Sequence, residues 1–127
     1  MPEGDKYFVA GASKADDLAL HLLTFPAEIR RQETRVLDLV EIHELIVANI
    51  KEQDARFLSN INANPAFKND GQRKTELEAM RNASKEYADA LIQEKTYGEN
   101  LAIANIDLIF VQNMFRAYLS IVGGHKP

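Results

Sequence analysis

The 127-residue sequence contains no cysteine. Disulfide bonds, thiol catalysis and cysteine-ligated zinc are therefore excluded, although this absence does not fix a cellular compartment. Common catalytic motifs are lacking as well: there is no phosphate-binding loop, no glycine-rich nucleotide fingerprint, no Gly-x-Ser-x-Gly and no supported Ser/His/Asp arrangement. The sequence therefore predicts a protein that is not an enzyme, with no catalytic residue and no cofactor.

A strong charge of one sign is also missing, because 15 basic and 19 acidic residues give a net charge of −4. Such a balance creates no global field that would recruit nucleic acid or an anionic membrane. The apolar patch at Tyr7–Ala10 is too short for the hydrophobic region of a signal peptide. The most apolar stretch, 100–124, contains scattered polar side chains that make membrane insertion costly. We therefore expect a cytoplasmic protein without a membrane partner.

The second half of the sequence carries a heptad pattern of apolar residues. One series, broken only by Glu94, consists of Met80, Tyr87, Leu101, Leu108, Phe115 and Val122. An apolar residue at every seventh position, with others three or four away, forms one stripe along a helix. The pattern predicts a long helix over 73–122, roughly 75 Å at 1.5 Å per residue. Glycines then end the helix and begin a tail over 123–127.

The first half of the sequence predicts helix on both sides of a proline. Ser13 and Asp16 form a capping-box-like start for a short helix over 13–25, after a flexible N-terminus over 1–12. Pro26 interrupts the pattern, so either two helices meet there or one helix kinks. A long helix over 27–59 follows, and its heptad series is Ile29, Val36, His43, Ile50 and Phe57.

Asparagine, proline and glycine are concentrated between the two long helices and predict a turn over 60–72. The helical stretches on either side of this turn, 13–59 and 73–122, have nearly equal lengths and are expected to fold back on each other. The predicted fold class is all-α: a long antiparallel, coiled-coil-like helical hairpin with a short N-terminal helix. We expect a single helical domain over 1–127 that assembles into a helical bundle.

Apolar residues extend beyond the main stripe on both long helices. Leaving a large aliphatic side chain in water loses about 1.5–3 kcal/mol of burial energy. This excess predicts a homo-oligomer, most simply a dimer that forms a four-helix bundle, unless residues 13–25 fold back over part of the surface. The candidate interface residues are Leu101, Ile106, Leu108, Phe110, Phe115 and Leu119.

Glu41, His43 and Glu44 are the only cluster of metal-ligating residue types. Their spacing does not bring the ligands onto one helix face, as Glu-x-x-His would. We therefore predict no metal ligand and interpret His43 as a polar seam residue that sets register. Glu94 also occupies a seam position. It either sets helix register, as His43 does, or is a functional carboxylate. A metal-binding helical bundle stays as a second alternative function.

Two basic groups suggest another function, that of a nucleic-acid-binding accessory protein. They consist of Arg30, Arg31 and Arg35 in the first long helix, and of Lys68, Arg73 and Lys74 at the turn. Basic clusters near an aromatic residue such as Phe67 are typical of nucleic-acid contacts. The other interpretation is an ordinary solvated helix surface, because acidic residues outnumber basic ones over 33–54.

Four short segments of the second long helix give it a family likeness. They are Arg73-Lys74-Thr75-Glu76, Glu86-Tyr87, Ile106-Asp107 and Asn113-Met114-Phe115-Arg116-Ala117. In these segments the chain resembles small helical accessory proteins of phage and prophage recombination modules. The resemblance implies a role beside recombination or nuclease proteins, in contact with DNA or with a DNA-processing enzyme. From the residues themselves, the leading hypothesis is a non-catalytic interaction or scaffold protein that acts through its helix faces on a protein partner still to be identified.

Overall fold

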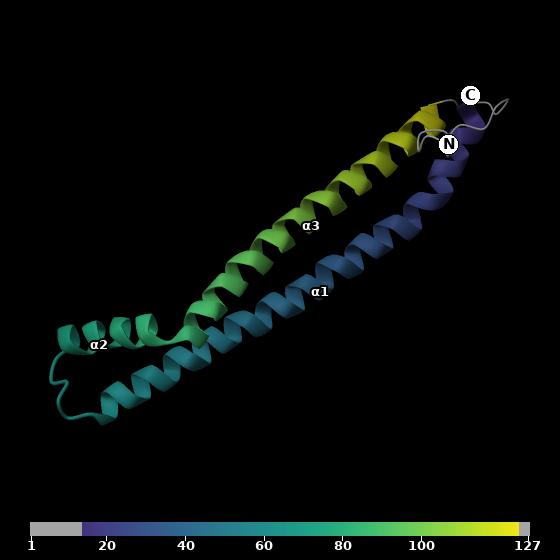
Figure 1. Cartoon of the computed structure of the whole chain (residues 1–127). Helices are drawn as coiled ribbons and strands as arrows, with labels where there is room; N and C mark the ends of the chain where they lie inside the picture. Colours follow the sequence, from purple (N-terminus) through teal and green to yellow (C-terminus); the bar gives the residue numbers. More distant parts are fainter. Residues whose placement is uncertain (1–13, 125–127) are drawn as a thin grey trace. The chain divides into compact units, whose positions relative to one another are not determined.

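The computed structural model describes residues 14–124, and the side chains of residues 19–123. The described chain is all-helical, with three helices and no strand (Figure 1). They are α1 (Lys14–Ala63), α2 (Asp70–Ala83) and α3 (Lys85–Gly124). None of the three carries a stretch apolar enough to span a lipid bilayer. The expected helix start at Ser13 lies outside the described residues.

Helix α1 is one continuous helix of 50 residues that contains Pro26. Of the two arrangements left open at Pro26, the chain adopts one helix rather than separate helices over 13–25 and 27–59. Proline removes one backbone donor, so the carbonyl of Leu22 loses its helical partner. Ring contacts of the preceding residue offset part of this loss, because Phe25 lies 5.8 Å from Phe115 and 5.3 Å from Tyr118 between ring centres.

The turn between α1 and α2 is shorter than predicted. Helix α1 continues to Ala63, where the Asn64 side chain accepts a hydrogen bond from the Ala66 N–H at 2.9 Å. Helix α2 begins after Asn69, whose side chain accepts the Gln72 N–H at 2.9 Å. Both asparagines satisfy backbone donors that a turn or a helix start leaves open. The predicted turn over 60–72 therefore includes residues that are helical at both of its ends.

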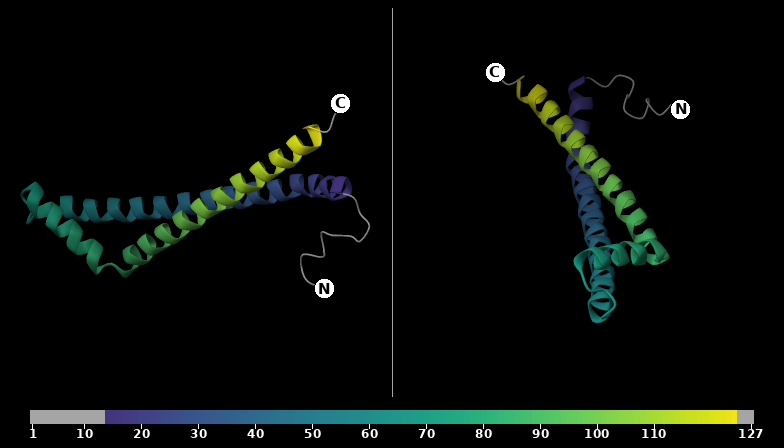
Figure 2. Two further views of the ribbon diagram at one scale, coloured as in Figure 1. Left: turned by 90° about the horizontal axis from the view of Figure 1, so that it is seen from above. Right: turned by 90° about the vertical axis from the view of Figure 1, so that its left-hand side faces the viewer.

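The single helix expected over 73–122 is interrupted at Ser84, which separates α2 from α3 (Figure 2). Ser84 has extended backbone angles (φ −91°, ψ 111°), and its N–H donates to the Arg81 carbonyl at 3.3 Å. Its hydroxyl accepts the Tyr87 N–H at 3.1 Å. Ser84 thus ends one helix and caps the next, which is a common use of serine.

The chain divides into two compact units. Among the described residues, unit 1 contains 14–36 and 103–124, and unit 2 contains 37–102. In unit 1, His21, Phe25, Phe115 and Tyr118 form an aromatic cluster, and Ala104 is fully buried. The buried residues of unit 2 are Ile46, Gln53, Ile61, Tyr87 and Ala90.

The predicted seam of α1 is half-buried at all five positions, which are Ile29, Val36, His43, Ile50 and Phe57. On α3 the predicted series is buried at Tyr87 and half-buried at its next four positions, 94, 101, 108 and 115. Two alanines of another series are buried still more deeply, since Ala90 and Ala104 are 3% and 0% exposed. These alanines lie fourteen residues apart, which is two heptads. Small side chains allow two helices to approach closely, so burial on α3 follows residue size as well as hydrophobicity.

Candidate interaction surface

Large apolar side chains of α3 remain exposed on successive turns. In unit 1, Ile103, Ile106 and Phe110 are 52%, 65% and 63% exposed. Their spacing of three and four residues places them on one side of the helix. We refer to these three residues as the α3 face. Exposed apolar side chains that cluster in this way are typical of interaction sites rather than of scattered surface positions.

The six predicted interface residues fall into two groups. Ile106, Phe110 and Leu119 are exposed, whereas Leu101, Leu108 and Phe115 are half-buried within the chain. Phe115 packs against Phe25 of α1, so its ring already has an intramolecular partner. Ile103 is exposed to a similar extent but was not among the predicted interface residues.

Further apolar side chains are exposed on both units. Unit 1 adds Leu20 and Leu23 of α1, together with Ile109, Leu119, Ile121 and Val122 of α3. Unit 2 exposes Leu37, Ile42, Leu45, Leu58, Leu91 and Ile92. The α3 face and the other exposed residues of α3 in unit 1 lie in a nearly uncharged stretch, because Asp107 and Arg116 are the only charged residues of 100–124.

Carboxylates neutralise three of the six basic residues that were candidates for nucleic-acid contacts. Arg31 pairs with Glu28, Arg35 with Asp107 at 3.1 Å, and Arg73 with Asp70 at 3.2 Å. The Arg31 and Gln32 side chains both hydrogen-bond to Glu28, and these bonds lower the pKa of that carboxyl. Arg30, Lys68 and Lys74 are exposed. The two basic groups belong to different units.

His43 and Glu94 are brought together in unit 2, a contact that the sequence analysis did not predict. The His43 Nε2 atom lies 3.9 Å from a Glu94 carboxylate oxygen, and the Gly98 backbone passes beside the imidazole ring. Glu41 and Glu44 are exposed on other sides of α1. Among the described side chains, no three histidine, aspartate or glutamate residues are grouped closely enough to hold a metal ion.

The most connected polar group of unit 2 surrounds Asp54. One Asp54 carboxylate oxygen accepts a hydrogen bond from the Arg81 Nε–H at 2.8 Å, and the other accepts the Tyr87 hydroxyl at 3.4 Å. The guanidinium of Arg81 lies over the Tyr87 ring, which also packs against Phe57. We call Asp54, Arg81 and Tyr87 the Asp54 clasp, because one side chain of α1 binds both the end of α2 and the start of α3.

Burial raises the pKa of the Tyr87 phenol, and the neighbouring Asp54 carboxylate adds to this shift. The hydrogen bond to Asp54 is the main reason why the pKa of Arg81 is raised. Both shifts favour the neutral tyrosine and the charged arginine that the clasp uses. Sequence reasoning missed this group, because its members are 27 and 33 residues apart in the chain.

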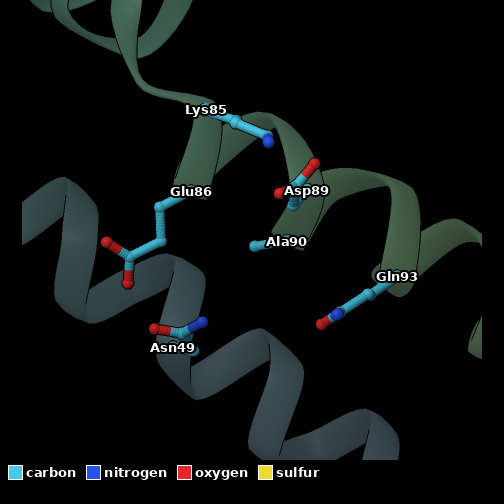
Figure 3. A pocket seen from close by; sticks show the side chains of 6 residues that line it. All are labelled: Asn49, Lys85, Glu86, Asp89, Ala90 and Gln93. Carbon is cyan, nitrogen blue, oxygen red and sulfur yellow. The ribbon is translucent and has the colours of Figure 1, made fainter.

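An open hollow of about 440 Å³ lies beside the start of α3 (Figure 3). Figure 3 shows Asn49 of α1 on one side of the hollow and five residues of α3 on the other. The α3 residues are Lys85, Glu86, Asp89, Ala90 and Gln93. The lining combines one amine, two carboxylates and two amides, without a nucleophile that is paired with a base. It offers hydrogen bonding but no recognisable reaction chemistry.

Comparisons with protein-family models, with curated proteins and with solved structures found no match to this chain. Its function must therefore be argued from its own residues.

Proposed function

We propose that the chain is a non-catalytic interaction protein that pairs with a second copy of itself through the α3 face. The observation that carries this proposal is the exposure of Ile106 and Phe110, about two thirds of each residue, one turn apart on α3. Burying the exposed part of one such side chain contributes about 1–2 kcal/mol. The three residues of the face, counted on both copies, therefore supply several kcal/mol toward association.

The charge of the surrounding stretch supports a second copy as the partner. In a two-fold symmetric contact each residue meets the same surface of the other subunit, so a charged surface opposes itself. Over 100–124 the only charges are Asp107 and Arg116, and Arg35 of the same chain already binds the Asp107 carboxylate. Two α3 faces can thus meet without like-charge repulsion.

The antiparallel helical hairpin belongs to this proposal. Two pairs of contacts support it within unit 1: His21 stacks on Tyr118, and Arg35 binds Asp107. Within unit 2, His43 lies near Glu94 and Phe57 contacts Tyr87. In each unit the residue number on α3 falls as the number on α1 rises. Two such hairpins, joined through their α3 faces, would form a four-helix bundle.

Sedimentation equilibrium or light scattering after size exclusion tests the proposal. We expect the unmodified chain to show about twice its chain mass of 14.3 kDa, and the variant Ile106→Glu/Phe110→Glu to be monomeric. The glutamates would face each other across the two-fold contact and remain hydrated in the monomer.

The control variant is Leu45→Glu, which places a charge at a leucine that is 71% exposed in unit 2. It should leave the dimer intact. A monomer for the unmodified chain across a concentration series would contradict the proposed function. A dimer that Ile106→Glu/Phe110→Glu does not weaken would assign association to a different face.

A further inference from the structure

The interruption between α2 and α3 consists of one residue, and that residue is neither proline nor glycine. Ser84 alone departs from helical geometry, between Ala83 and Lys85. Sharp helix breaks usually have a proline, a glycine or an inserted group as their cause. Alanine and lysine are strong helix formers, so the local sequence does not require a break here.

The backbone hydrogen bonds at the break have direct replacements in a continuous helix. The Ser84 N–H, which donates to Arg81, would instead donate to Met80. The Tyr87 N–H, which the Ser84 hydroxyl accepts, would donate to Ala83. The bond from the Ala88 N–H to the Ser84 carbonyl, 3.1 Å long, has helical spacing already. The continuous helix therefore satisfies these three donors, and it also gives the N–H groups of Lys85 and Glu86 acceptors at Arg81 and Asn82.

The Asp54 clasp distinguishes the two forms. Residues 81 and 87 of a continuous helix are about 9 Å apart along its axis and about 120° apart around it. The two side chains then leave the helix in different directions, so one carboxylate on the neighbouring helix holds them less closely together. In the broken form Asp54 binds Arg81 at 2.8 Å and Tyr87 at 3.4 Å. The clasp is thus a set of contacts that favours the broken form.

We propose that unit 2 is a conformational switch in which residues 70–102 interconvert between the broken pair of helices and one continuous helix. Ser84 is the hinge between the two helices, and the contacts of the Asp54 clasp stabilise the broken form. Met80 and Tyr87 belong to one heptad series, so the continuous helix keeps a single apolar stripe. This switch does not depend on the proposed self-association.

A distance measurement by double electron–electron resonance tests the switch. The chain has no cysteine, so Lys74→Cys and Lys95→Cys introduce the only two labelling sites, one on α2 and one on α3. Both lysines are exposed. In a continuous helix their backbones are about 32 Å apart, and in the broken form they are closer.

Lys85→Pro provides the broken reference. Proline is favoured at the first position of a helix, and it holds the preceding residue in the extended backbone that Ser84 already adopts. Ser84→Ala removes the cap and should raise the ratio of continuous to broken helix about fivefold. Adding Arg81→Gln weakens the contact with Asp54 and should make the continuous form predominant.

The matched control is Ser120→Ala, the same change at an exposed position of α3, and it should leave the distances unchanged. Far-UV circular dichroism verifies that each variant is folded. The proposal is overturned if folded Ser84→Ala and Ser84→Ala/Arg81→Gln both give the distance distribution of Lys85→Pro. A shift of these variants toward about 32 Å establishes the switch.

Discussion

At the scale of single residues, Gly98 is a position where the sequence does not use the best helix former. Its backbone lies inside α3, next to the His43 ring. An added methyl group would be 3.6 Å from the His43 Nε2 atom and 3.9 Å from its Cδ2 atom. These are ordinary van der Waals distances, so the imidazole leaves room for alanine.

Gly98→Ala is therefore expected to raise the free energy of unfolding by about 0.5–1 kcal/mol, because alanine loses less backbone entropy in a helix. Urea unfolding followed by circular dichroism measures the change. The reverse substitution at an exposed alanine of the same helix, Ala88→Gly, should lower the free energy by a similar amount. A loss of stability in Gly98→Ala would mean that His43 requires the space beside the glycine.

Tyr87 makes the stability of the protein depend on alkaline pH. Its pKa is raised by burial and by Asp54, so the folded protein holds the phenolic proton more tightly than the unfolded chain does. The stabilisation is complete below the ordinary tyrosine pKa of about 10 and is lost as the pH rises through the higher folded value. Between about pH 8 and pH 11, Tyr87→Phe should therefore lose less stability than the unmodified protein.

Urea unfolding at the two pH values measures this difference. Tyr97→Phe, a change at a half-buried tyrosine of the same helix, is the matched control and should follow the unmodified protein. Near neutral pH, Tyr87→Phe should itself be about 1 kcal/mol less stable, because it loses the hydrogen bond to Asp54. If the unmodified protein and Tyr87→Phe lost equal stability between about pH 8 and pH 11, the assigned role of Tyr87 would be contradicted.

At the scale of elements, α1 shows that a proline does not always divide a helix. Pro26 is exposed and lies in the interior of α1, where it removes a backbone hydrogen bond. The neighbouring contacts of His21 and Phe25 with Tyr118 are long-range in sequence, so the heptad pattern alone could not decide between two helices and one.

Pro26→Ala should stabilise the protein by about 1–3 kcal/mol, because it restores the missing bond and removes the clash of the proline ring with the preceding turn. Thermal and urea unfolding provide the measurement. Ala27→Pro, which adds a second proline at the next position, should instead cost about 3 kcal/mol or more. An unchanged unfolding midpoint in Pro26→Ala would contradict this expectation. It would mean that the α1 backbone adjusts around the proline without a loss in the free energy of unfolding.

The existence of the helices could be predicted from the sequence better than their ends. The heptad positions of α1 are half-buried as expected, and the chain is all-helical in its described part. The break at Ser84 could not be predicted, because it depends on Asp54, which is 27 residues from Arg81 in the chain. The asparagines before Asn64 were assigned to the turn, although α1 continues to Ala63.

At the scale of the whole molecule, the sequence predicted excess apolar surface but not how it is distributed. Ile106 and Phe110 are exposed, while Phe115 of the same predicted set is covered by Phe25. Heptad spacing identifies residues that share a helix face, but it does not say which faces the chain itself covers. Pairing with a second copy stays a prediction until the mass of the assembly is measured.

The two units also differ in how their residues are ordered along the chain. Unit 2 is one unbroken segment, 37–102, whereas unit 1 combines residues from both sides of it. During synthesis at about 5–20 residues per second, residue 36 must wait roughly 3–13 seconds before residue 103 is made, and the earlier residues of unit 1 wait longer. Phe25 thus lacks its ring partners Phe115 and Tyr118 during this time, and a chaperone that binds nascent apolar segments would find a long-lived target there.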